Sequence, residues 1–165
     1  MKNDHSGFTL VELMTVLAIV AVLASLSVSN LIACRPRYKL GAAVTDILSM
    51  LQNARLRAVK ENRRVVVLFD PDGNGRLEGD YLAFVDNGNG GAGEWTRQGE
   101  DGEPLVAGGK VPEGVRLDRT TFAHDRLRFD SRGHLIDINR RIILKNSNGL
   151  SKKIFVYASG NCRVD

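Results

Sequence analysis

One carboxylate lies inside the longest apolar stretch of the chain, and its position constrains function more than any other residue. Glu12 is the only charged residue in 8–33, a stretch that also contains no Pro or Gly. A helix over 8–33 would be about 39 Å long, which is enough to cross a bilayer with some tilt. An ionised carboxylate in hydrocarbon costs about 2.5–3.5 kcal/mol, so Glu12 needs a cationic partner and marks a functional site.

The partner of Glu12 has to come from outside the span, because 8–33 contains no Lys or Arg. Cleavage of the bond between Gly7 and Phe8 would create a terminal amine at the start of the span. In an assembly, that amine would lie beside Glu12 of a neighbouring copy or relative. The attraction between the two charges is strong in a low-dielectric medium, although the cost of desolvating them cancels much of it. The pair would then favour assembly over the isolated subunit.

A second group of potential ligands lies in the acidic stretch 70–81. Oxygen-bearing side chains stand at nearly alternate positions, followed by the Gly and the apolar residue that an EF-hand loop has at its sixth and eighth places. These candidate calcium ligands are Asp70, Asp72, Asn74, Glu78 and Asp80. The twelfth place is Tyr81, however, where the loop needs a bidentate carboxylate. The alternative is an acidic hairpin turn built from Asp-Gly and Asn-Gly dipeptides, which the missing ligand favours.

Two cysteines, Cys34 and Cys162, form a possible disulfide if the domain lies in an oxidising compartment. Pairing requires the C-terminal strand to reach the membrane end of the helix. A metal site made by these cysteines is less favoured, since the chain has no CxxC or HxxxH spacing.

Enzymatic function has little support in the sequence, and we predict no catalytic residues and no cofactor apart from the possible calcium. Asp130, Ser131 and His134 are close in sequence, but catalytic triads are assembled by the fold, not by sequence proximity. No P-loop, dinucleotide-binding fingerprint or nucleophile elbow is present.

The helix that carries Glu12 is predicted to continue to about Asn62. Apolar residues recur there at steps of three and four, which is the pattern of one buried stripe on an amphipathic helix. They are Leu40, Val44, Ile47, Leu51, Ala54 and Ala58. We expect 34–62 to dock on a domain, and Pro36 to bend or loosen the helix because it removes a hydrogen bond.

After Arg63 the pattern changes to that of strands. Runs rich in β-branched and aromatic residues occur at 65–69, 81–85, 126–129, 134–138, 141–144 and 153–157, and Gly- and Asn-rich links separate several of them. A helix followed by strands predicts an α+β fold, with an antiparallel sheet packed on the helix. The Gly-rich stretch 87–109 is interpreted as a mobile or specifically decorated loop.

Length and charge bound the remaining possibilities. The chain has 165 residues and a net charge of +4, which leaves one modest domain after the span and does not make nucleic acid the default partner. Positive charge follows the span at Arg35, Arg37 and Lys39, whereas 70–103 is acidic.

The N-terminal residues carry a specific resemblance. Gly7-Phe8-Thr9-Leu10-Val11-Glu12, after a short polar leader, resembles the class III signal of type IV prepilins and type II secretion pseudopilins. The resemblance implies that a prepilin peptidase cuts between Gly7 and Phe8 and methylates the amine of Phe8. It also implies that Glu12, the fifth residue of the mature chain, is the assembly glutamate.

The later motifs narrow the family. The segment 52–62, the sequence Phe129-Asp130-Ser131-Arg132-Gly133 and the closing Ser159-Gly160 with Arg163 are similar to the GspH/FimT family of minor pilins. The resemblance implies the type IV pilin-like fold and a subunit that primes a type II secretion pseudopilus or a type IV pilus at its tip. The implied partners are other pilins or pseudopilins, the prepilin peptidase and the inner membrane. The motifs do not separate the two filament systems.

The expected organisation has four parts. Residues 1–7 are a cleaved leader, 8–33 a transmembrane and assembly helix, 34–62 its amphipathic second half, and 63–165 a β-rich periplasmic domain. Some related pseudopilins bind calcium in a loop of their sheet region, which keeps the loop 70–81 a candidate.

DNA binding in DNA uptake is the alternative function, because FimT-like proteins carry a Gly-Arg-x-Arg tail that contacts phosphates. Here the tail keeps only Arg163 of that pair, with Lys152 and Lys153 nearby. Asp165 adds the opposite charge, so a solvated final strand is the favoured interpretation of this tail.

Overall fold

The computed structural model describes residues 9–70, 79–88, 97, 103–136 and 140–165, with the side chains of 26–33 excepted. The chain separates into two compact units, Met1–Arg35 and Pro36–Asp165. The helix α1, Leu10–Glu61, is assigned continuously through Pro36. This agrees with the predicted helix, while the predicted bend at Pro36 stays a prediction. Within the described part of the chain, no helix is both long and apolar enough to cross a membrane.

The end of α1 is fixed by local backbone chemistry. Asn62 adopts a left-handed conformation with φ of 51°. Its N–H bonds to the Val59 carbonyl oxygen, and the N–H of Arg63 bonds to that of Ala58. This is the Schellman arrangement, which satisfies the last helical carbonyl groups and turns the chain into the first strand.

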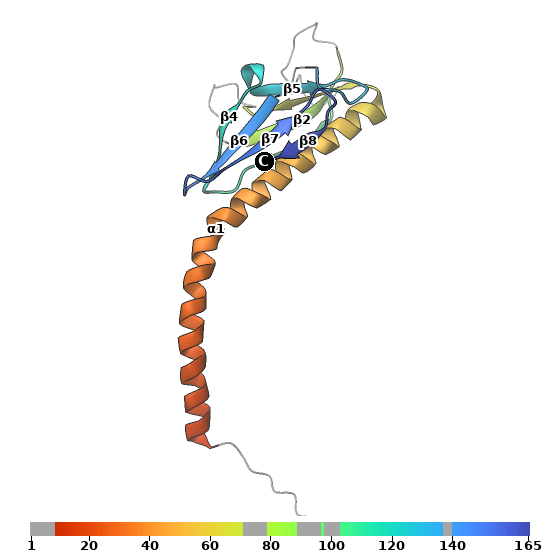
Figure 1. Cartoon of the computed structure of the whole chain (residues 1–165). Helices are drawn as coiled ribbons and strands as arrows, with labels where there is room; N and C mark the ends of the chain where they lie inside the picture. The colour runs from red at the N-terminus through yellow and green to blue at the C-terminus, as the bar shows by residue number, and fades with distance from the viewer. Residues whose placement is uncertain (1–8, 71–78, 89–96, 98–102, 137–139) are drawn as a thin grey trace, which may run out of the picture. The chain divides into compact units, whose positions relative to one another are not determined.

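Within the described residues, eight strands follow the helix, and Figure 1 shows the sheets that they form. The first sheet has the order β3-β2-β1-β5 and the second the order β4-β6-β7-β8. Their bounds are β1 Arg64–Leu68, β2 Asp80–Asp86, β3 Leu105–Lys110, β4 Val115–Thr120, β5 Arg126–Phe129, β6 Arg140–Asn146, β7 Ser151–Val156 and β8 Cys162–Val164, with a short 3-10 helix at Ala123–Asp125. All strand pairs within the two sheets are antiparallel. The α+β class and the antiparallel pairing are confirmed, but the single predicted sheet is in fact two.

The core lies between α1 and the inner faces of both sheets. The predicted helix stripe is buried, since Leu40, Val44, Ile47, Leu51, Ala54 and Ala58 are each at most 4% exposed. These residues pack against Val65, Val67, Phe69, Ala83, Val85, Leu117, Leu127, Phe129, Ile142, Leu144, Ile154 and Val156. Every buried member of this main core has a number of 40 or higher, so the unit 36–165 contains its whole core and we treat it as an independently folding domain.

Two sequence predictions about the strands are wrong. The predicted loop 87–109 contains the start of β3, whose Gly108 and Gly109 hid the strand pattern. A Cβ at position 109 would lie only 2.7 Å from the Tyr81 hydroxyl oxygen, which is too close, so glycine fits there better than a residue with a side chain. The predicted strand 134–138 is reduced to an isolated bridge between Leu135 and Phe129, and 137–139 lie outside the described residues.

Candidate functional site

The first turn of α1 is held by Thr9, which sequence reasoning had not assigned a role. The Thr9 hydroxyl oxygen accepts a hydrogen bond from the Glu12 N–H at 3.2 Å, and the Thr9 carbonyl oxygen accepts one from the Leu13 N–H. Thr9 therefore caps the helix and fixes the backbone position of Glu12. A carboxylate in the first turn also interacts favourably with the helix dipole. Gly7 and Phe8 lie outside the described residues.

The helix after Glu12 presents apolar side chains on all sides. Large residues from Leu10 to Leu23 are between 54% and 76% exposed in the single chain. A helix that is apolar all round needs a surrounding apolar medium or packed neighbours. Among the described side chains of this segment, Glu12 is the single ionisable group.

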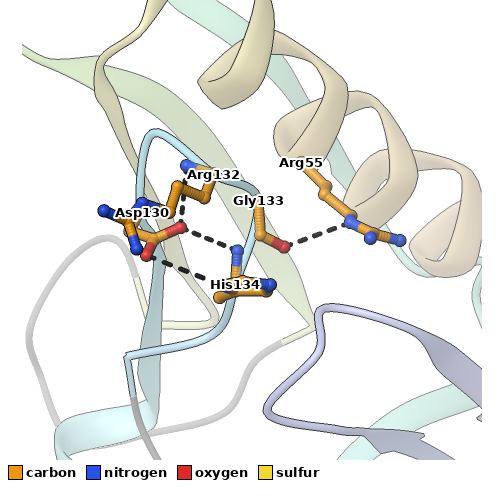
Figure 2. Close-up of polar contacts among 5 residues, drawn as sticks. All are labelled: Arg55, Asp130, Arg132, Gly133 and His134. Carbon is orange, nitrogen blue, oxygen red and sulfur yellow. Dashed lines mark hydrogen bonds and ion pairs between the residues drawn. The ribbon is translucent and has the colours of Figure 1, made fainter.

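In the second unit, Arg55 connects α1 to two turns that are far away in the sequence, and Figure 2 shows its contact with the first of them, at Gly133. Its Nε donates to the Gly133 carbonyl oxygen at 3.1 Å, and its Nη1 donates to Oδ1 of Asn161 at 2.8 Å. The Asp-Ser-Arg-Gly and Ser-Gly motifs noted in the sequence thus meet at one helix residue. These hydrogen bonds stabilise the fold, because the Arg55 guanidinium donates to acceptors of the same chain.

Asp130 serves the turn in which it lies (Figure 2). Its Oδ1 accepts from the N–H groups of Arg132 at 2.9 Å and His134 at 2.8 Å. Its Oδ2 is 4.0 Å from His134 Nδ1. The Asp130 carboxylate therefore stabilises the turn 130–134. This explains why the residues of the Asp-Ser-Arg-Gly motif occur together.

The calcium hypothesis falls mostly on undescribed residues. Asp72, Asn74 and Glu78 lie outside the described part of the chain. Asp80 lies at the start of β2, where its Oδ1 is 3.1 Å from Nζ of Lys110. No group of three or more His, Cys, Asp or Glu that could hold a metal occurs among the described residues. Calcium binding at Asp70 to Asp80 stays a prediction.

Cys34 and Cys162 are both free in this structure, and a disulfide between them stays a prediction. Cys34 is exposed on α1, whereas Cys162 lies opposite Val156 in the pairing of β7 with β8 and packs against the main core. Burial raises the pKa of the Cys162 thiol to about 11, while the positive charge of Arg55 acts in the opposite direction. The thiol is thus used as a small core group.

The three cations proposed for DNA binding do not share one surface. In the pairing of β7 with β8, Arg163 lies opposite Phe155, and Lys153 is two residues from Phe155 on the same face. Lys152 pairs with buried Leu144 and lies on the other face of the sheet. Side chains alternate along a strand, so neighbouring lysines in the sequence point apart.

The same register reveals cations that sequence reasoning did not assign to a site. Arg116 pairs with Lys145, Arg119 with Ile143, and Arg141 with Phe155. These pairings place them on the outer face of the second sheet with Lys153 and Arg163. We call this set the outer basic face: Arg116, Arg119, Arg141, Lys145, Lys153 and Arg163. Arg116 forms an ion pair with Asp118 at 3.4 Å, and no other member of the set forms an ion pair with an acid among the described residues.

Comparison with protein families gives two matches. Residues 43–160 match the family model described as type II transport protein GspH. Residues 2–28 match the prokaryotic N-terminal methylation motif. The two matches together cover most of the chain and include the Glu12 segment.

Similar proteins are found by sequence and by structure. The pilin-like protein PilA1 of Thermus thermophilus is 30% identical over 165 residues, covering 96% of this chain and 97% of the relative. The minor pilin FimU of Pseudomonas aeruginosa superposes with a TM-score of 0.59 at 15% identity, over 78% of this chain and 90% of FimU. The minor pseudopilin EpsH of Vibrio cholerae superposes with a TM-score of 0.55 at 12% identity, over 77% of this chain and 96% of EpsH.

Proposed function

The chain belongs to the GspH family of minor pilins and pseudopilins, and on that premise we propose that it primes the assembly of a periplasmic filament from its tip. The filament is a type IV pilus or a type II secretion pseudopilus. The observation that carries the proposal is Glu12, the one charge in the apolar stretch 8–33, set in the first turn of a capped helix. FimU is a minor pilin and EpsH a minor pseudopilin, which supports the role of a minor filament subunit for this chain.

In this proposal the N-terminal segment changes its surroundings during assembly. Before assembly, 8–33 anchors the chain in the inner membrane with the domain in the periplasm; the apolar sequence and the methylation motif support this. After cleavage behind Gly7, the methylated amine of Phe8 pairs with the Glu12 carboxylate of an adjoining subunit. The exposed apolar side chains of 10–25 then pack against neighbouring helices.

The test is the N-terminal mass of membrane-extracted protein together with the amount that enters filaments, in wild type and Glu12→Gln. We expect both chains to begin at N-methyl-Phe8, and the variant to enter filaments at least about tenfold less, equivalent to about 1.4 kcal/mol. Glu61→Gln is the matched control, because Glu61 is on the same helix but pairs with Arg57 at 2.7 Å. It is expected to assemble like wild type.

Two results would overturn this proposal. An intact Met1 in cells with an active prepilin peptidase would make 8–33 an ordinary anchor. Equal assembly of Glu12→Gln and wild type would remove the role of the carboxylate. Tip priming is tested separately by labelling the protein on filaments, where labels along the shaft would contradict it.

DNA binding in DNA uptake is a second candidate, favoured by the outer basic face. Cations on adjacent strands can neutralise successive phosphates, and such binding weakens steeply with salt. The quadruple variant Arg119→Gln, Arg141→Gln, Lys153→Gln, Arg163→Gln should abolish salt-dependent binding of duplex DNA to the domain, whereas Lys152→Gln should change it little. Absence of binding by the wild-type domain near physiological salt would eliminate this candidate.

A further inference from the structure

One end of the domain 36–165 is built from the first helical residues of that unit and two turns. Lys39 Nζ donates a hydrogen bond to the Glu113 carbonyl oxygen at 2.9 Å. The next residue, Gly114, accepts a hydrogen bond from the Ser147 N–H through its carbonyl oxygen. The turn between β6 and β7 therefore lies beside the start of the domain's helix, as Figure 1 also shows.

This end carries an excess of positive charge. Arg37 and Lys39 are exposed, and Lys145 is half-buried. Arg116 faces Lys145 across the strand pair. Both line an open hollow of about 640 Å³ with the turn 147–149. The opposing charges are Glu113 beside the helix and Asp118, which pairs with Arg116.

The same end exposes an aromatic ring and a large aliphatic side chain. Tyr38, between the two helical cations, is 76% exposed, and Leu150, at the end of the β6–β7 turn, is 45% exposed. Tyrosine and cations with long apolar stems are the residues that prefer the boundary between lipid and water. We call Arg37, Tyr38, Lys39, Arg116, Lys145 and Leu150 the basic rim.

The sequence limits how far the helical members of the basic rim can lie from the membrane in an anchored chain. Only Cys34, Arg35 and Pro36 separate Ala33, the end of the apolar stretch, from Arg37. In the membrane-anchored state that we propose above, Arg37 and Tyr38 would therefore lie at the level of the lipid headgroups, which occupy about 5–7 Å on each side of the bilayer.

We propose that the basic rim binds the anionic phospholipid headgroups of the membrane that holds the chain before assembly. This rests on the proposed function, in that it needs 8–33 to be a membrane anchor. Lys and Arg attract the anionic surface, while Tyr38 and Leu150 enter the interface. The contact would hold the domain against the membrane and would have to break when the subunit enters a filament.

The test is the partition of the domain 36–165, with an acetylated N-terminus, onto vesicles of phosphatidylcholine with and without phosphatidylglycerol. We expect binding that needs phosphatidylglycerol and weakens with salt. Arg37→Gln with Lys145→Gln should lower the partition coefficient about 25-fold, because each cation near an anionic surface contributes about 1 kcal/mol, or about fivefold. Tyr38→Ser with Leu150→Ser should lower it as well without changing the net charge.

The matched control is Arg141→Gln with Lys153→Gln, which removes the same charge from the outer basic face and leaves the basic rim intact. It should keep nearly wild-type partition. Equal losses in the two double variants would mean unspecific attraction, and would overturn the proposal. Absence of binding to phosphatidylglycerol vesicles by the folded wild-type domain would also overturn it. The same holds if the domain binds an acidic protein or DNA through Arg37 and Lys145 but does not bind the vesicles.

The melting temperature of each variant shows that it is folded, so a loss of partition is a loss of contact. The domain used in this test lacks 8–33, and its result is independent of cleavage and of Glu12. A negative result here with a positive Glu12 result would remove the lipid contact alone.

Discussion

Gly160 and Gly133 meet so closely that a side chain at position 160 has no room. A Cβ on Gly160 would fall on the carbonyl oxygen of Gly133, far inside van der Waals contact. Both glycines have positive φ, 78° and 76°. That same carbonyl oxygen accepts the hydrogen bond from Arg55. The two turns are therefore joined through a backbone contact that only glycine allows.

Gly160→Ala is expected to destabilise the domain by more than 2 kcal/mol. About 1–2 kcal/mol comes from the left-handed backbone, and the clash with Gly133 adds to it. Gly149→Ala is the matched control, because its φ is 84° but the nearest atom to a new Cβ is Lys145 Cε at 4.0 Å. Thermal and urea unfolding of the two variants separate strain from clash. Equal destabilisation would show that the contact with Gly133 contributes nothing.

Arg55→Met should lower the free energy of unfolding by about 1.5–3 kcal/mol, because it keeps the apolar stem but leaves the buried Gly133 carbonyl oxygen without its charged donor. Arg57→Met, two residues along the helix, removes an i,i+4 surface ion pair with Glu61. That change should cost only about 0.3–0.5 kcal/mol. Urea unfolding measures both variants. If the two variants lose the same amount, Arg55 is merely another surface cation.

The Cys162 thiol should react slowly in the folded domain 36–165, which lacks Cys34. Burial raises the pKa of Cys162 to about 11, and the thiolate is the reactive form. Iodoacetamide at pH 8 should therefore modify the unfolded domain at least tenfold faster than the folded one. Arg55→Met should slow the folded reaction further, since the Arg55 charge lowers this pKa. Equal rates in folded and unfolded protein would contradict the burial of the thiol.

The same raised pKa makes stability depend on pH. The folded state keeps the proton of Cys162 above pH 9, where the unfolded thiol loses it, so the unfolded state binds fewer protons. The contribution of Cys162 to the free energy of unfolding is therefore fully present below pH 9 and is lost as the pH rises toward about 11. Cys162→Ala should remove this part of the decline, and the difference between the two unfolding curves isolates it from the titration of lysines and tyrosines.

Sequence predicts the elements whose pattern is local and unbroken. The stripe from Leu40 to Ala58 is regular, and it is buried as predicted. In β4 the register shifts between Leu117 and Arg119, which breaks the alternation that would have revealed the strand. The glycines of β3 had the same effect, because the space at Gly109 is limited by the side chain of Tyr81 and that at Gly108 by the side chain of Leu82, both from another strand.

Contacts between distant positions were beyond sequence reasoning for a physical reason. Arg55 bonds to residues 78 and 106 positions away, and no local period encodes such a pairing. The residues predicted to bind DNA are divided between two faces of the sheet for a related reason. Lys152 and Lys153 are adjacent in the chain but lie on opposite faces of β7, while Arg141 joins Lys153 only through the register of β6. Glu12 could be identified from the sequence because the signal, a single charge within an apolar stretch, depends only on neighbouring residues.

Asn62 provides a test of how α1 is terminated. Its φ of 51° lies in the left-handed region, which asparagine tolerates better than most residues and which glycine adopts without cost. Asn62→Val should destabilise the domain by about 1–2 kcal/mol, and Asn62→Gly should leave it as stable or slightly more stable. Calorimetry of the domain 36–165 should show a melting temperature lowered by roughly 3–8 °C for the valine variant. Asn53→Val, within α1 and free of the positive φ, controls for the change in side chain and should cost only a few tenths of a kcal/mol. If Asn62→Gly proved as harmful as Asn62→Val, the asparagine side chain itself, and not the backbone conformation, would be what ends the helix.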